Sequence, residues 1–135
     1  MIRDAVEADI PAIMDMGRKF ADDAGVTNKI GWHDATVESL LRVMIEGHVL
    51  LIGDRGMIGG FVFPHPLSGR MVFQELFWRS EGFEGVRLLA AAEKQAKAMG
   101  CERSLMIGID TMPDVAGLYA RLGYEPAERN FIKEL

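Results

Sequence analysis

One acidic side chain of this 135-residue sequence lies inside an apolar run, a setting that favours acid–base chemistry. Residues 71–78 are rich in aromatic and β-preferring side chains, which predicts a strand containing Glu75. Partial desolvation there would raise the carboxyl pKa toward the range useful to a general base. Two other interpretations stay open, a solvated sheet edge or an ion pair with Arg70 or Arg121. Alternation predicts one face of Met71, Phe73, Glu75 and Phe77 and another of Val72, Gln74, Leu76 and Trp78.

A glycine-containing turn follows this strand and leads into a predicted helix over residues 86–99. Glycines let a backbone approach a ligand closely, and the free N–H groups at a helix start attract phosphate. Arg79 and Arg87 would add positive charge, whereas Glu81 would oppose a pyrophosphate, as would the acidic residue at 84. An ordinary strand-to-helix turn is the alternative. The candidate nest comprises Gly82, Phe83, Glu84, Gly85 and Val86.

Tyr119 is the third candidate, on a short predicted helix beside the neighbouring strand ends. A phenol can donate a proton to a leaving thiolate. The alternative is a core tyrosine with its hydroxyl at the rim. Trp32 and His33, on a long predicted loop, either contact a substrate or pack that loop. Cys101 is expected to be a buried, inert thiol, because no histidine lies near it in sequence.

The elements that must position these residues alternate along the chain. Their order predicts one α/β domain over residues 1–135, with a mixed, mostly antiparallel sheet covered by helices. Gly25, Gly100 and Gly123 are the predicted helix stops, and Thr36 is the predicted cap of the second helix. The predicted strands are 2–6, 48–52, 57–63, 70–78, 104–109 and 124–135, and the predicted helices are 7–24, 36–46, 86–99 and one starting at Pro113 or Asp114.

Composition excludes several function classes. With 15 basic and 20 acidic residues the net charge is −5, which argues against a nucleic-acid partner. No apolar run approaches the ~20 residues that span a membrane, and the N-terminus does not resemble a signal peptide. A single cysteine and three scattered histidines predict neither a disulfide framework nor a metal site. A cytoplasmic protein is therefore expected.

Several stretches also carry a family resemblance. They are the opening residues 2–13, the helix 85–100, and the ending Leu118-Tyr-Ala-Arg-Leu-Gly-Tyr124 with Phe131-Ile-Lys-Glu-Leu135 after it. On these the chain resembles, over nearly its whole length, the GNAT superfamily of acyl-CoA-dependent N-acyltransferases. Residues 74–78 are similar to small phage-type members. The resemblance implies a GNAT-like fold with helices on both faces and a parallel strand pair that splays apart.

The family's pyrophosphate-binding turn, Arg/Gln-x-x-Gly-x-Gly/Ala, is degenerate here. One register begins at Arg79 and keeps Gly82, but it places Glu84 where a small residue belongs. The other register, set by the paired leucines at 88 and 89, ends on Gly85 but lacks the central glycine.

The resemblance implies a mechanism with acetyl-CoA as co-substrate. An amine would attack the thioester directly, Glu75 or a water that it orients would take the proton, and Tyr119 would protonate the leaving thiolate. The pyrophosphate would bind the N–H groups at the helix start, and the pantetheine arm would run beside the splayed strand. The implied cofactor-binding residues are Leu76, Phe77, Trp78, Gly82, Phe83, Glu84, Gly85, Val86 and Arg87.

The resemblance leaves two function classes open. The first is an N-acetyltransferase acting on a primary amine of a small molecule or a protein. The second is a catalytically inactive GNAT-fold binding or structural module, favoured by the degenerate turn. The acceptor is unspecified, because acceptor contacts come mostly from loops. A homodimer could form through the final strand or through the hairpins of 57–78.

Overall fold

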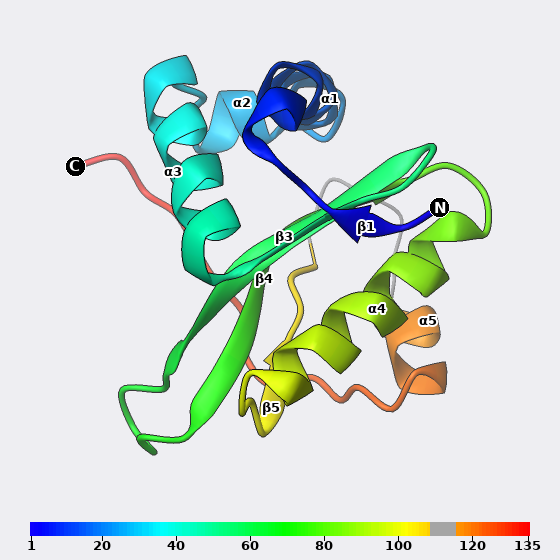
Figure 1. Ribbon diagram of the computed structural model, residues 1–135. Coiled ribbons are helices and arrows are strands. Elements are labelled where there is room, and N and C mark those ends of the chain that lie inside the picture. Colours follow the sequence, from blue (N-terminus) through cyan, green and yellow to red (C-terminus); the bar gives the residue numbers. More distant parts are fainter. Residues whose placement is uncertain (109–115) are drawn as a thin grey trace.

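The computed structural model describes residues 1–108 and 116–135, which form a five-stranded mixed sheet (Figure 1). The strand order is β1-β2-β3-β4-β5; the first three pairs are antiparallel, and β4 pairs with β5 in parallel. The predicted α/β class and mixed sheet are thus confirmed. The elements are β1 (Arg3–Asp4), η1 (Glu7–Asp9), α1 (Ile10–Asp23), α2 (Val26–Lys29), α3 (Asp34–Gly47), β2 (Val49–Ile52), β3 (Gly56–Pro64), β4 (Met71–Ser80), α4 (Glu84–Ala98), β5 (Arg103–Leu105) and α5 (Ala116–Arg121).

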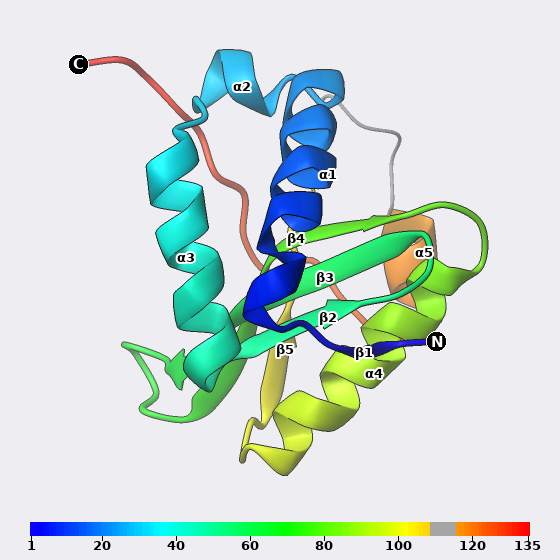
Figure 2. The ribbon, with the colours of Figure 1, turned by 45° about the horizontal axis from the view of Figure 1, so that its top comes forward.

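Helices cover both faces of the sheet, as expected: α1–α3 lie on one face and α4 with α5 on the other (Figures 1 and 2). The strands serve both layers by alternation, so that Val49 and Leu51 pack with α4 while Leu50 packs with α1 and α3. Each such side chain, when fully buried, contributes about 1.5–3 kcal/mol of hydrophobic stabilisation. The α4 layer includes Phe73, Leu88 and Leu89, and the α1–α3 layer includes Ile13, Leu41, Met44 and Met57.

The N-terminal helices differ in detail from the prediction. The segment expected as one helix starts with the 3-10 turn η1 before α1, and the expected loop contains the short helix α2. Gly25 ends α1 in the left-handed region with φ 74°, as predicted. The cap of α3 is His33 rather than Thr36, because the imidazole Nδ1 accepts the Thr36 N–H at 3.4 Å.

A β-bulge interrupts β4 at Leu76. Gly60 is opposite Glu75 and Gly59 is opposite Phe77, so Leu76 has no partner residue in β3. The strict alternation predicted for this strand is therefore wrong beyond Glu75. Phe73 and Trp78 pack in the α4 layer, whereas Phe77 packs in the α1–α3 layer.

The C-terminal third departs most from expectation. Strand β5 ends at Leu105, and the predicted helix start at Pro113 or Asp114 lies outside the described residues. The predicted final strand is wrong, since residues 124–135 form no strand. They lead from α5 to the side of the molecule where α3 lies (Figures 1 and 2), and Phe131 there is 90% exposed. Apolar residues near the end of a segment do not make it a strand without a partner strand to accept its backbone hydrogen bonds.

In the part of the chain that the structure describes, no helix has the length and apolar character needed to cross a membrane.

The bulge generates a prediction about Gly60. A Cβ there would collide with the backbone carbonyl oxygen of Gln74 and lie 2.7 Å from the Phe73 ring. We expect Gly60→Ala to lower the free energy of unfolding by about 2–3 kcal/mol, measured by urea denaturation. Gly47→Ala is the matched control, because a Cβ at Gly47 meets nothing within 4 Å and should be neutral or stabilising. Equal stability of the two variants would contradict the bulge geometry.

Candidate functional site

The parallel pairing of β4 with β5 ends before β4 does. The last paired residues are Gln74 and Leu105, while β4 continues to Ser80 with β3 alone as its strand partner among the described residues. The bulge at Leu76 begins just beyond that point. Among residues 1–108 and 116–135, no strand pairs with the β5-facing edge of β4 over residues 76–80, beyond the carboxyl end of β5. Such an edge can receive an extended ligand as an additional strand.

Glu75 lies at the start of this opening and is only 3% exposed. Its Oε1 accepts the backbone N–H of Ile107 at 3.4 Å. Burial raises the pKa of Glu75 to about 7, and the Ile107 N–H opposes part of that rise. The predicted desolvation is confirmed, and the interpretation of a solvated edge is wrong. Arg70 pairs instead with Glu102 at 3.9 Å.

Tyr119, on α5, also bonds to Ile107, the residue whose N–H Glu75 accepts. Its hydroxyl donates to the carbonyl oxygen of Ile107 at 2.9 Å, and its half-buried ring stacks on Trp78 with centroids 6.1 Å apart. The pKa of Tyr119 is raised, first by burial and then by the charge of Glu75. The phenol therefore stays protonated throughout the neutral range. The structure brings the two predicted catalytic residues together on Ile107, which the sequence did not indicate.

Tyr124 is a third member of this group that the sequence did not single out as functional. Its hydroxyl lies 3.0 Å from Glu93 Oε2 and 2.7 Å from Ser104 Oγ, so it can donate to the carboxylate and accept from the serine. Burial is the main reason that the pKa of Tyr124 is raised to about 12. Its ring lies 5.6 Å from that of Tyr119. Tyr124 therefore anchors the chain after α5 to α4 and β5.

The start of α4 carries the predicted phosphate nest. Gly82 adopts φ 67°, a conformation that favours glycine. Phe83 is the N-cap; it makes no side-chain cap hydrogen bond, and its ring is 92% exposed. No capping side chain therefore blocks the first N–H groups of α4, and the Val86 and Arg87 side chains are also exposed.

Glu84 does not place its charge in front of this nest, contrary to expectation. Its carboxylate turns into the fold and accepts the N–H groups of Asp54 and Arg55 at 3.0 and 2.8 Å. Gly85 is buried, and its carbonyl oxygen accepts the Trp78 indole N–H at 3.1 Å. The degenerate turn is thus tied to the sheet at two points.

The side chains of residues 76–78 point in different directions. Leu76 is exposed, Phe77 packs in the α1–α3 layer and Trp78 packs in the α4 layer. What these three residues share is the open backbone edge of β4. Any contact of these three residues with a cofactor would therefore come mainly from their backbone N–H and C=O groups, and less from their side chains.

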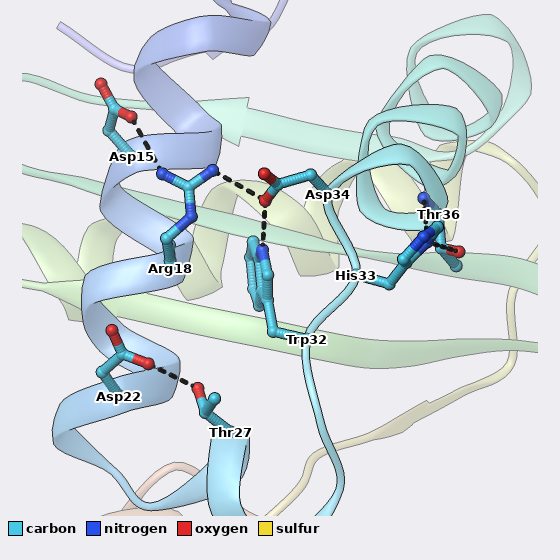
Figure 3. Close-up of polar contacts among 8 residues, drawn as sticks. All are labelled: Asp15, Arg18, Asp22, Thr27, Trp32, His33, Asp34 and Thr36. Carbon is cyan, nitrogen blue, oxygen red and sulfur yellow. Dashed lines mark hydrogen bonds and ion pairs between the residues drawn. The ribbon is translucent and has the colours of Figure 1, made fainter.

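Trp32 and His33 hold the loop before α3 in place (Figure 3). The Trp32 indole N–H and an Arg18 N–H both donate to Asp34 Oδ1, each at 2.7 Å. The hydrogen bond from Arg18, followed by that from Trp32, lowers the pKa of Asp34. These contacts support the packing interpretation of both residues.

Two surface hollows lie apart from the Glu75–Tyr119 pair. One, of about 460 Å³, is lined by Trp32, His33 and neighbouring residues of the α2–α3 segment. The other, of about 300 Å³, is lined by Met16, Lys19, Asp54, Arg55, Arg79 and Glu81. Neither hollow is lined by Glu75 or Tyr119. The candidate site is therefore identified from the hydrogen bonds and burial of these two residues, and not from either hollow.

No family model matches the sequence, and no curated protein does either. Solved structures match over the whole chain. A transcriptional regulator from Bacillus halodurans C-125 has TM-score 0.75 at 20% identity, covering 100% of this chain and 99% of its own. An aminoglycoside acetyltransferase from an uncultured soil metagenomic sample, in complex with sisomicin, has TM-score 0.69 at 16% identity, covering 100% and 95%.

A ribosomal-protein-alanine N-acetyltransferase from Brucella melitensis biovar Abortus 2308 has TM-score 0.68 at 11% identity, covering 100% of this chain and 98% of its own. Other matching structures also carry acetyltransferase names. At these identities the similarity establishes the fold and leaves the activity to the residues of the site. The chain has a GNAT-like fold.

The burial of Glu75 generates a prediction about stability against pH. A carboxyl whose pKa rises on folding holds its proton more tightly when folded, so stability falls as pH increases from its ordinary value of 4.5 to about 7. That interval corresponds to about 3 kcal/mol. Between pH 4.5 and pH 8, the unfolding free energy of the wild type should fall by about that much more than that of Glu75→Gln. The unfolding free energies are measured by urea denaturation at each pH. If they change with pH equally in the wild type and in Glu75→Gln, Glu75 is solvated in the folded protein.

Proposed function

We propose that this protein is an N-acyltransferase, with one domain over residues 1–135, that moves an acetyl group from acetyl-CoA directly to a primary amine. The observation that carries the proposal is the meeting of buried Glu75 and Tyr119 on Ile107, beside the open edge of β4. Two of the matching structures are named as acetyltransferases of an aminoglycoside and of a ribosomal protein. An amine on a small molecule or on a protein is accordingly the proposed acceptor.

Acetyl-CoA would use two backbone features. Its pyrophosphate would accept the N–H groups of residues 82–86 at the start of α4, where Arg87 adds positive charge. Its pantetheine arm would extend along Leu76, Phe77 and Trp78 at the unpaired edge of β4. A backbone N–H of that edge would hold the thioester oxygen as negative charge develops on it.

The proton chemistry follows from the two side chains. The amine nitrogen bonds to the acetyl carbon, the carbon–sulfur bond breaks, and Glu75 or a water that it orients takes the nitrogen's proton. Tyr119 gives its proton to the departing thiolate and is then reprotonated from Glu75 or from solvent. The charge of Glu75 raises the pKa of Tyr119, so protonation of Glu75 makes Tyr119 a stronger acid. Once Glu75 has taken the proton of the amine, it thus makes Tyr119 a better proton donor to the thiolate.

The alternative is a GNAT-fold binding or structural module without catalysis. The degenerate turn supports it, and one matching structure is named a transcriptional regulator. The net charge of −5 opposes a nucleic-acid partner for this chain. The buried, protonatable pair favours the enzyme, because a binding module has no need of a desolvated carboxyl with a raised pKa.

The proposal includes a cytoplasmic location and a homodimer. The lone Cys101 supports a reducing compartment. Exposed apolar residues in the C-terminal segment, Phe131 and Ile132, and the unpaired outer edge of β5 among the described residues support contact between two copies.

Binding of acetyl-CoA is the first test. A ligand at 100 times its Kd stabilises the native state by about 2.7 kcal/mol, so millimolar acetyl-CoA should raise Tm by several degrees. Differential scanning calorimetry measures the shift, with adenosine as the control that lacks the pyrophosphate and pantetheine groups. If acetyl-CoA, CoA and longer acyl-CoAs all leave Tm unchanged, the non-catalytic module is favoured.

Removing the Tyr119 hydroxyl tests the acid. Tyr119→Phe keeps the ring that stacks on Trp78, so the acetyl-CoA-induced Tm shift should persist while turnover falls about 100-fold or more. Tyr124→Phe is the matched control: it removes a hydroxyl bonded to Glu93 and Ser104, outside the proton path, and should cost far less turnover. Equal turnover of wild type and Tyr119→Phe would remove Tyr119 from the mechanism. Glu75→Gln should lose most activity relative to the wild type at and just above neutral pH, where Glu75 is ionised and can accept the amine proton; the two rates, measured against pH, should converge below about pH 6, where Glu75 is protonated.

A further inference from the structure

Glu84 is a buried carboxylate that the proton chemistry above does not use. It belongs to the first turn of α4, is 9% exposed, and accepts two backbone N–H groups from the β2–β3 turn, thirty positions earlier in the chain. The acceptor distances are 3.0 Å from Asp54 N and 2.8 Å from Arg55 N. Charge-assisted hydrogen bonds of this kind are about twice as strong as neutral ones.

The β2–β3 turn is shaped to receive this carboxylate. A Cβ on Gly53 would collide with Glu84 Oε1 and lie 2.5 Å from its carboxyl carbon, so glycine is required for the carboxylate to fit. The Gly53 N–H donates to the Gly56 carbonyl at 2.9 Å and closes the turn. The Glu81 N–H donates to the Arg55 carbonyl at 3.2 Å, which adds a second link between this turn and the loop before α4.

These contacts fix the part of α4 that would hold a pyrophosphate. Glu84 ties the first turn of the helix to the β2–β3 turn, and the Trp78 indole ties the Gly85 carbonyl to β4. Neither contact occupies the N–H groups of residues 84–86, which follow the N-cap Phe83 and have no acceptor within the helix. A ligand that binds those groups then loses little free energy in ordering them.

The charge of Glu84 acts in the opposite direction. A carboxylate near an anion site repels the anion, but this one is turned inward, and two N–H dipoles point at it. Removing Glu84 therefore has two opposed effects on phosphate affinity, and their balance can be measured. Because Glu84 is buried and accepts two hydrogen bonds, we expect the loss of order at the start of α4 to be the larger effect.

We propose that Glu84 is a positioning residue of the acyl-CoA site, which anchors the start of α4 to the β2–β3 turn and thereby compensates for the missing small residue of the turn motif. The inference rests on the proposed function. It predicts that the affinity for CoA depends on the hydrogen bonds between Glu84 and the β2–β3 turn, although that turn would not itself contact CoA.

The test measures the Kd for CoA by isothermal titration calorimetry, and KM and kcat for acetyl-CoA. Glu84→Ala should raise Kd and KM about tenfold while kcat at saturation changes less than about twofold. Glu84→Gln, which keeps one acceptor oxygen, should lie between the wild type and Glu84→Ala. Glu81→Ala is the matched control, an acidic residue of the same loop whose side chain is exposed; it should not raise Kd, because the loss of a negative charge beside an anion site does not weaken binding of the anion.

Gly53→Ala separates position from charge. It keeps the Glu84 charge but displaces the carboxylate, so it should weaken CoA binding as Glu84→Ala does. Unchanged or tighter binding in Glu84→Ala would overturn the inference, and tighter binding would identify repulsion as the dominant effect. If Glu84→Ala does not fold by circular dichroism, Glu84→Gln and Gly53→Ala decide. If the wild type binds no CoA, the proposed function itself is refuted. If the wild type binds CoA and Glu84→Ala binds it with the same Kd, only this inference is refuted.

Discussion

The site depends on one extra residue in a strand. Leu76 has no partner in β3, and the glycines opposite it, Gly59 and Gly60, leave no room for a Cβ. The bulge reverses the order of faces, sending Phe77 to the α1–α3 layer and Trp78 to the α4 layer. It also coincides with the end of the β4–β5 pairing. A strand of regular pleat would continue that ladder and close the edge that the proposed ligand uses.

Trp78 shows how this local irregularity reaches both ends of the site. Its indole N–H is bonded to the start of α4, and its ring stacks on Tyr119 of α5. Glu75 and Tyr119 meet on the two polar groups of Ile107. The start of α4, Tyr119 and Glu75 are thus connected through a few contacts near the bulge, so their relative positions are set by packing.

At Glu75 the proposed function is opposed to stability. Its burial raises the pKa to about 7, which suits a general base but weakens the fold once the carboxyl is ionised. Glu84 is the contrasting case, a buried carboxylate that receives two N–H donors. The described part of the chain therefore uses two buried acids in different ways, one left with a single long hydrogen bond and one fully engaged in holding an element in place.

The sequence by itself determined the order of elements up to α5, apart from the short η1 and α2, together with the class of sheet, the glycine stops and the desolvation of Glu75, because these follow from local periodicity and neighbouring residue types. Only the tertiary structure decided the bulge, since the need for glycine at 59 and 60 arises from contacts across strands. The meeting on Ile107 and the reach of Glu84 to the β2–β3 turn join residues about thirty positions apart, which spacing along a chain does not encode. The final strand failed for the same reason: an apolar pattern at 131–135 specifies a face, but a strand forms only where a partner edge accepts its hydrogen bonds.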